Sequence, residues 1–303
     1  MSENHVLQGA YHVLERTSEA FPEPLRNIAN PPEKLYVVGY PEALVPGLAV
    51  IGARKATPYG RSCARRFARI AAEKGVVVIS GGARGCDSEA HRAALDAQGR
   101  TVVFLGGGCD CIYPAEHERL FQRVVDNGGA VASEHPWGFA PLPYTFRARN
   151  RLIAGLADAV LIVEAGLPSG TFSTADEALE AGKEVLVVPG AITSESSRGS
   201  NRLLFQGATP IVDDDSFEDA VLRACGMLKR PSAGFAMPHS DNPIVCAVLA
   251  APMDNDSLLE LAIAEYGAAS ARTKLMESLA EAEASHIIAR QPDGKWGPVM
   301  PTG

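Results

Sequence analysis

Three arginines within five residues, Arg147, Arg149 and Arg151, stand just before an apolar run that has the character of a β-strand. A guanidinium group donates paired hydrogen bonds whose geometry matches the oxygens of a phosphate. Phe146 precedes the arginines. An aromatic ring can stack on any nucleobase, so such a contact does not depend on the nucleic-acid sequence. With Asn150 as a further polar group, this segment predicts a binding site for a phosphorylated ligand.

Four glycine- or hydroxyl-rich turns follow strand-like runs elsewhere in the chain, one of them the three glycines at 106–108. Glycine lets the backbone approach an anion, and successive N–H groups in such a turn form an anion-binding concavity. The carboxyl ends of parallel strands share one edge of a sheet, where ligands bind. From the other three turns we expect phosphate contacts by Arg54, Lys55, Ser80, Gly81, Gly82, Arg84, Ser169, Gly170 and Thr171.

Motifs of two other kinds of phosphate-binding site are missing from the sequence. Arg54 stands where a dinucleotide-binding GxGxxG turn has its second glycine, and no GxxxxGK[ST] loop occurs. Asp87 and His91 lie four residues apart, but no nucleophile or metal-binding partner completes a catalytic set. We expect Asp87 to cap its helix and His91 to pack in the core. The prediction is therefore no catalytic residue, no metal and no cofactor.

Strand-like and helical patterns alternate from residue 34 onward. Short apolar runs such as 76–80 and 158–163 are separated by amphipathic segments such as 60–74. This alternation predicts an α/β fold with a mainly parallel, doubly wound sheet that is covered by helices on both faces. Before it, a short helix is expected at 10–19.

Composition divides the chain into four parts. We expect an N-terminal extension at 1–33, the α/β domain at 34–228, a proline-rich linker at 229–243 and a smaller domain at 244–303. The last part contains two helix-like segments and a hairpin signal, which together outline a winged helix. A small helical cap without a role in nucleic-acid binding is the alternative.

Charge is unevenly distributed along the chain. The net charge is −8, yet the segment from Arg54 to Arg84 holds eight basic residues and one acid. From Asp213 to the end, seven basic residues face fourteen acids. The α/β domain therefore keeps a positive patch for an anionic partner, whereas the tail is acidic. No apolar run long enough for a membrane span and no signal peptide is present, and the six cysteines suit a reducing, cytoplasmic setting.

Residues 31 to 212 resemble the DNA-processing protein A (DprA/Smf) family. The matching blocks occur in order and at suitable spacings: GARKATPYG at 52–60, SGGARGCD at 80–87, YP at 113–114, RNRLIAGL at 149–156, VEA at 163–165, SGT at 169–171, PG at 189–190, GSN at 199–201 and QGA at 206–208. The resemblance implies an extended Rossmann-like domain that dimerises and binds single-stranded DNA in a positive pocket at the strand ends. The implied role is a non-enzymatic mediator that protects incoming single-stranded DNA and loads the recombinase RecA during natural transformation.

Two other functions use the same pocket. One is a Rossmann-like enzyme that cleaves nucleoside monophosphates, and the other is a sensor of a nucleotide-derived signal. Such an enzyme carries a glutamate where this chain has Thr174, so Glu164, Asp176 or Glu177 would have to replace it. Whether a carboxylate lies free in the pocket separates the enzyme from the two binding functions.

Overall fold

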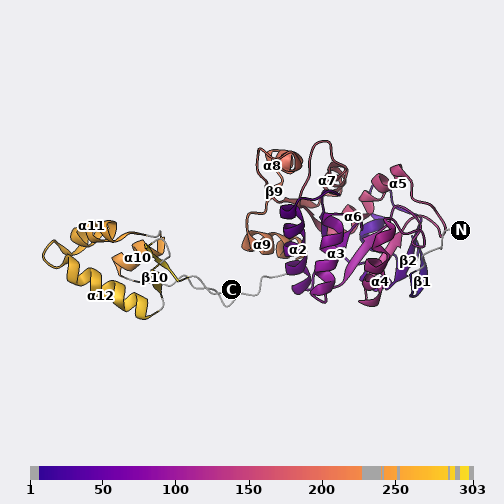
Figure 1. Ribbon diagram of the computed structural model, residues 1–303. Coiled ribbons are helices and arrows are strands. Elements are labelled where there is room, and N and C mark those ends of the chain that lie inside the picture. Colours follow the sequence, from indigo (N-terminus) through magenta and orange to yellow (C-terminus); the bar gives the residue numbers. More distant parts are fainter. Residues whose placement is uncertain are drawn as a thin grey trace. The chain divides into compact units, whose positions relative to one another are not determined.

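The computed structural model describes residues 7–226, 240, 242–250, 253–285, 287–290 and 294–299. It divides the chain into two compact units, Met1–Lys229 and Arg230–Gly303, drawn in Figure 1. Most of the expected linker at 229–243 lies outside the described residues. Among the described helices, none is long and apolar enough to cross a bilayer.

The first unit is built on a nine-stranded sheet in the order β1-β2-β6-β5-β4-β3-β7-β8-β9. Across the sheet, each strand in the series β6-β5-β4-β3-β7-β8-β9 runs parallel to its neighbour. Strand β2 is antiparallel to both β1 and β6. The expected mainly parallel sheet is confirmed. The strands are β1 Tyr11–Glu15, β2 Lys34–Gly39, β3 Gly47–Ile51, β4 Val78–Ser80, β5 Thr101–Phe104, β6 Ala130–Ser133, β7 Ala157–Ile162, β8 Glu184–Val187 and β9 Thr209–Pro210.

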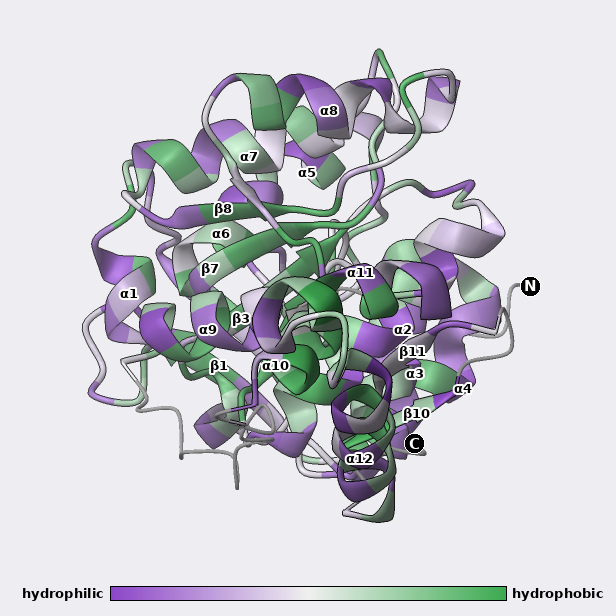
Figure 2. Ribbon diagram, turned by 90° about the vertical axis from the view of Figure 1, so that its left-hand side faces the viewer, coloured by the Kyte–Doolittle hydropathy of each residue, from purple (hydrophilic) through white to green (hydrophobic). Residues whose placement is uncertain are grey.

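Helices cover both faces of this sheet. Side chains on each strand alternate between the two faces, and here both sets are apolar, so both faces are buried under helices. On β3, Ala49 and Ile51 join the core under α1, α6, α7 and α8, while Leu48 and Val50 join the core under α2, α3 and α9. The strands are accordingly among the most hydrophobic parts of the unit (Figure 2). The helices are α1 Glu23–Arg26, α2 Pro58–Glu73, α3 Cys86–Asp96, α4 Glu118–Asp126, α5 Pro143–Ala148, α6 Asn150–Leu156, α7 Thr171–Glu180, α8 Arg198–Phe205 and α9 Asp214–Ala224.

The order of the strands reverses at β3. The chain proceeds from β3 outward through β4 and β5, and later returns to place β7 on the other side of β3. The loops that leave β3 and β7 therefore run to opposite faces of the sheet. In open α/β sheets this divergence leaves a crevice at the carboxyl ends of the strands, where ligands bind.

The expected helix at 10–19 is wrong, because residues 11–15 form the edge strand β1. Leu14 is buried opposite Leu35 of β2, whereas Tyr11 and Val13 remain exposed. That alternation has the period of a strand, and pairing with β2 satisfies the backbone. The N-terminal extension thus contributes to the sheet.

In the described residues of the second unit, three helices are followed by a two-stranded antiparallel sheet. Its apolar core includes Ile244 and Val248 from the first helix, Leu258 from the second, Leu279 from the third and Ile288 from the sheet. Helices followed by a strand pair were expected in this part of the chain, and the winged helix stays a prediction. The elements are α10 Pro243–Ala250, α11 Asn255–Tyr266, α12 Ala271–Ala284, β10 Ile288–Arg290 and β11 Trp296–Pro298.

Candidate nucleic-acid interface

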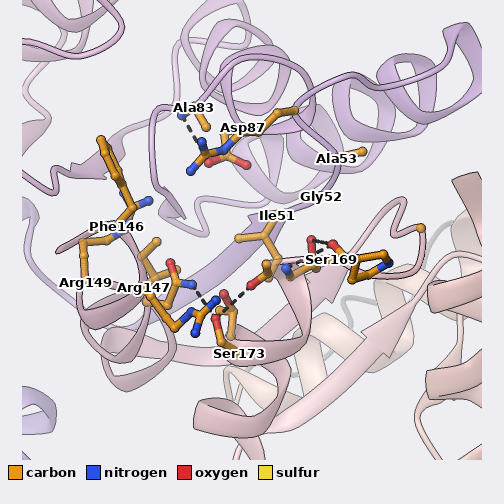
Figure 3. A pocket seen from close by; sticks show the side chains of 18 of the residues that line it. Ile51, Gly52, Ala53, Ala83, Asp87, Phe146, Arg147, Arg149, Ser169 and Ser173 are labelled. Carbon is orange, nitrogen blue, oxygen red and sulfur yellow. Dashed lines mark hydrogen bonds between the residues drawn. The ribbon is translucent and has the colours of Figure 1, made fainter. Parts of the chain in front are cut away.

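An open cavity of about 410 Å³ lies at the point where the strand order reverses, and we call it the main cavity. Its walls come from the loop after β3, the start of α3, helices α5 and α6, and the loop that leads into α7 (Figure 3). Eight of the fourteen residues expected at the site line it: Arg54, Phe146, Arg147, Arg149, Asn150, Ser169, Gly170 and Thr171.

Arg54 and Phe146 form the accessible part of this cavity. The guanidinium carbon of Arg54 lies 5.4 Å from the centroid of the Phe146 ring, a cation–π arrangement. Arg54 is exposed, Phe146 is half-buried, and Arg147 beside it is exposed. A phosphate and an adjoining base therefore find a cation and a ring at the same place.

A hydrogen-bonded turn fixes the position of Phe146. The Thr145 hydroxyl accepts the N–H of Leu142 at 3.1 Å and donates to the Leu142 carbonyl at 2.8 Å. This turn starts α5 and carries Phe146 and Arg147 to the cavity wall, where Figure 3 shows them on the same side as Arg149. The ring of Tyr113, which was not among the expected site residues, lies 5.2 Å from that of Phe146.

The turn before α7 contributes polar groups from the opposite wall. The Ser169 hydroxyl accepts the N–H of Thr171 at 3.2 Å and donates to the Thr171 hydroxyl at 2.9 Å. Asn150 donates to Ser173 at 2.8 Å, which ties α6 to the first turn of α7. The N-terminal end of α7, with its positive dipole, therefore borders the cavity.

Arg149 lines the cavity as a buried side chain that is bonded within the protein, and its expected phosphate contact stays a prediction. Only 5% of the residue is exposed, and its Nη1 donates to the carbonyl oxygens of Gly81, at 2.7 Å, and Phe104. Burial lowers the pKa of the guanidinium to about 10, although nearby Asp87 acts in the opposite direction. The side chain holds two strand ends together. A single sequence could not reveal this, because buried and exposed arginines look alike in it.

The turn after β4 also differs from expectation, because its groups are occupied within the protein. The Ser80 hydroxyl donates to the Val50 carbonyl at 2.6 Å, and the Gly82 carbonyl contacts the His117 ring nitrogen at 2.9 Å. The Ala83 N–H donates to the Asp87 carboxylate at 3.3 Å. Ser80, Gly81 and Gly82 thus lie beneath the cavity and do not line it.

Asp87 and His91 follow this turn in α3. Burial raises the pKa of the Asp87 carboxyl, and Arg149 and the backbone N–H groups of the turn oppose that shift. His91 is fully buried with Nδ1 2.7 Å from the Thr101 hydroxyl, and burial lowers its pKa to about 3. The expectation of a core histidine is confirmed.

Three expected cations lie outside the main cavity. Arg84 forms an ion pair with Glu116, and Arg151 donates to Glu134, with 2.6 Å between Nη2 and Oε2. Arg151 also donates to the backbone carbonyl of Asn30 at 2.8 Å, so it fastens α6 to the segment before β2. Lys55 is exposed on a neighbouring groove, described below.

The carboxylates that a nucleotide-cleaving enzyme would need are placed elsewhere. Glu164 is buried and accepts the Thr57 N–H at 3.1 Å, at the start of α2. Asp176 and Glu177 do not line the main cavity. Among the described residues, the carboxylate that does line it is Asp87, and no cluster of histidine, cysteine and acidic residues is suited to a metal ion.

Comparison with known proteins places this site in a family. A family model described as DNA recombination-mediator protein A matches residues 12–221. Protein Smf of Escherichia coli (strain K12) is 41% identical over 209 residues, which cover 69% of this chain and 56% of that protein. A putative DNA processing protein DprA of Mycobacterium tuberculosis is 45% identical over 173 residues, or 57% of this chain and 44% of that protein. The chain thus spans about half the length of these curated relatives.

Solved structures agree with the sequence match. The X-ray structure of DNA processing protein A from Streptococcus pneumoniae superposes with a TM-score of 0.66 at 32% identity, covering 70% of this chain and 74% of that chain. DNA processing protein A from Helicobacter pylori, described for its unique single-stranded DNA binding mode, gives 0.63 at 35% identity, covering 71% and 97%. Since the family model matches well over half of the chain, in the segment that forms the sheet and the main cavity, the chain belongs to the DNA recombination-mediator protein A family.

Proposed function

We propose that this chain binds single-stranded DNA in the main cavity and acts as a recombination mediator. The observation that carries the proposal is the position of Arg54 over the ring of Phe146, both of which line the cavity. The cation suits a phosphate, and the ring suits the adjoining base. Arg147 supplies a second exposed cation on the same wall.

A preference for single strands follows from this chemistry. Phe146 can stack only on a base whose face is free, and in a duplex both faces of a base are covered by its neighbours. The protein of Helicobacter pylori that superposes on this chain is described as binding single-stranded DNA, which supports the same ligand here.

We extend the proposal to the partner and the setting. The bound strand is protected and handed to the recombinase RecA, in the cytoplasm, in DNA recombination and natural transformation. The family description as a recombination mediator supports this role. We assign no catalytic activity, because Asp87, the carboxylate lining the cavity among the described residues, is held by Ala83 N–H and faces Arg149.

A homodimer completes the proposal. Helix α8 leaves Phe205 81% exposed, and the nearby strand β9 is an edge of the sheet. An exposed aromatic side chain close to a free sheet edge is a feature that a second copy of the chain can cover. Phe205→Ser is expected to lower the dimer fraction in sedimentation experiments, and an unchanged fraction would contradict this surface.

The proposal is tested by titrating fluorescently labelled oligo-dT and a duplex of equal length against the protein at two salt concentrations. We expect tight binding of the single strand only, with a salt slope of about −0.7 per phosphate contact. Salt-independent binding, or a preference for duplex, would contradict it. Recombinase loading is measured as faster RecA filament formation on the same strand, and no acceleration would overturn that part alone.

A further inference from the structure

A second groove lies beside the main cavity on the same edge of the sheet. It encloses about 420 Å³ between the loop after β3 and the first turns of α3, and we call it the second groove. Arg54 lines both spaces, so the two are adjacent at this side chain. The second groove is lined by Arg54, Lys55, Ala56, Arg61, Arg84, Gly85, Ser88, Glu89, Arg92 and His117.

The second groove is strongly cationic, with five basic side chains and one carboxylate, Glu89. Within the described part of the chain, Arg54, Lys55 and Arg61 form no ion pair. Arg61 donates from Nε to the Ala56 carbonyl at 3.2 Å, which holds its guanidinium at the groove. These three cations therefore keep their charge available for an anion.

The remaining two cations, Arg84 and Arg92, form ion pairs. Arg84 pairs with Glu116, and both side chains are about half exposed (56% and 52%). Arg92 lies 3.7 Å from Glu89, which also pairs with Arg65 at 2.8 Å. The Arg84–Glu116 pair, exposed on both sides, contributes little energy, so an incoming phosphate can replace Glu116 at small cost. Glu89 is only 16% exposed, so Arg92 is held more firmly.

An aromatic side chain stands between the two spaces. Tyr113 is 44% exposed, and its ring lies 5.2 Å from Phe146 in the main cavity. Tyr113 also lies near Arg84, which lines the second groove. A strand that stacks a base on Phe146 therefore meets a second ring next to the cations of the second groove.

We propose that the second groove binds phosphodiester groups of the nucleotides that follow the one in the main cavity. The strand passes over Arg54, its next base stacks on Tyr113, and its next phosphates bind Lys55 and Arg61. This inference rests on the proposed function. It adds the path of the strand from the main cavity into the second groove, and a binding site longer than one nucleotide. Arg61 and Arg92, which the sequence did not single out, become part of the interface.

The test compares oligo-dT of increasing length, between about 4 and 16 nucleotides, on the wild-type protein and on Lys55→Ala/Arg61→Ala. We expect wild-type affinity to rise with length as the strand enters the second groove. The double variant should bind the shortest strand like wild type and lose about tenfold in affinity per missing contact on longer strands. Its salt slope on long strands should fall by about 0.7 per missing contact.

Arg69→Ala is the matched control, because Arg69 is an exposed arginine of the same helix that lines neither space. It should behave like wild type at every length, and thermal melting of all variants checks that they fold. If the double variant keeps the full gain with length, the second groove is not a subsite, while the proposed function stands. If wild type binds no single strand at any length, both fail.

A terminal phosphate is the other source of the same chemistry. The series is therefore repeated with strands that carry a 5′-hydroxyl or a 5′-phosphate. Equal losses in the double variant with both ends support bound phosphodiesters. A loss confined to the 5′-phosphorylated strands would overturn the proposed path, because the second groove would then bind only a strand end.

Discussion

Arg149 and Gly81 are joined by a hydrogen bond of 2.7 Å, from the Nη1 of the arginine to the carbonyl oxygen of the glycine. The same nitrogen donates to the carbonyl of Phe104, so one buried guanidinium connects the ends of β4 and β5 with the junction of α5 and α6. Phe146 and Arg147 belong to α5. The wall that we propose to bind DNA is thus positioned by a buried arginine that also lines the main cavity.

Replacing Arg149 should therefore affect folding more than binding. Arg149→Ala leaves two buried carbonyls without a donor and removes the positive charge that faces Asp87, so we expect a loss of about 3–5 kcal/mol in the free energy of unfolding. Urea denaturation measures it. In contrast, Arg54→Ala should leave stability unchanged and weaken oligo-dT binding by about 1–3 kcal/mol. Equal stability of the two variants would show that Arg149 is not structural.

Phe146→Ala should weaken oligo-dT binding by about 1–3 kcal/mol, because the stacking surface for a base is lost. Phe146→Tyr keeps the ring and should retain most of the affinity, as measured by fluorescence anisotropy. The half-buried position of Phe146 predicts little change in melting temperature. A large drop in melting temperature would instead identify the ring as part of the core.

Gly81→Ala and Gly170→Ala form a pair that tests how closely Arg149 packs on the turn after β4. A Cβ at Gly81 would lie 2.5 Å from the nitrogens of the Arg149 guanidinium, whereas one at Gly170 would meet nothing within 4 Å. We expect Gly81→Ala to lower the melting temperature clearly and Gly170→Ala to leave it near the wild-type value. Similar melting of the two variants would contradict the packing around Arg149.

His91 should make the protein less stable as the pH falls. Its pKa is lowered from 6.5 to about 3 in the folded state, so the unfolded chain binds more protons between these values. The stability that the neutral ring contributes is present above pH 6.5 and is lost as the pH falls below it. We expect this residue to cost about 1.4 kcal/mol per pH unit in that window.

The measurement is the free energy of unfolding of wild type and His91→Gln at neutral and mildly acidic pH. The variant should show a smaller difference between the two conditions, since it lacks the titrating ring. Parallel pH profiles for the two proteins would mean that other groups cause the acid sensitivity.

Deleting the chain from Lys229 onward should leave the first unit folded and able to bind single-stranded DNA. That unit contains the whole sheet and both spaces described above, and the second unit has its own apolar core. The acidic tail offers little attraction for phosphates. Precipitation of the shortened protein would show that the deleted part belongs to the fold of the first unit. Loss of most of its oligo-dT affinity would show that the deleted part belongs to the binding site.

The sequence by itself determined the fold class and the edge of the sheet that carries the site. The helical period of 3.6 residues and continuous apolar runs are set by neighbouring residues, so β4, α2 and β7 could be predicted from them. Strand β1 could not, because its five residues become a strand only by pairing with β2. Short edge elements are decided by their partners rather than by local propensity.

Only the tertiary structure decided which arginines are exposed at the main cavity. Arg147, Arg149 and Arg151 stand within five residues, yet one is exposed at the main cavity, one is buried beneath it and one pairs with Glu134. Residues two positions apart along a helical backbone point in different directions. The partners that occupy a guanidinium come from distant strands and loops. The sequence therefore predicted a phosphate-binding edge, while the fold separated its cations into exposed ones at the main cavity and ones bonded within the protein.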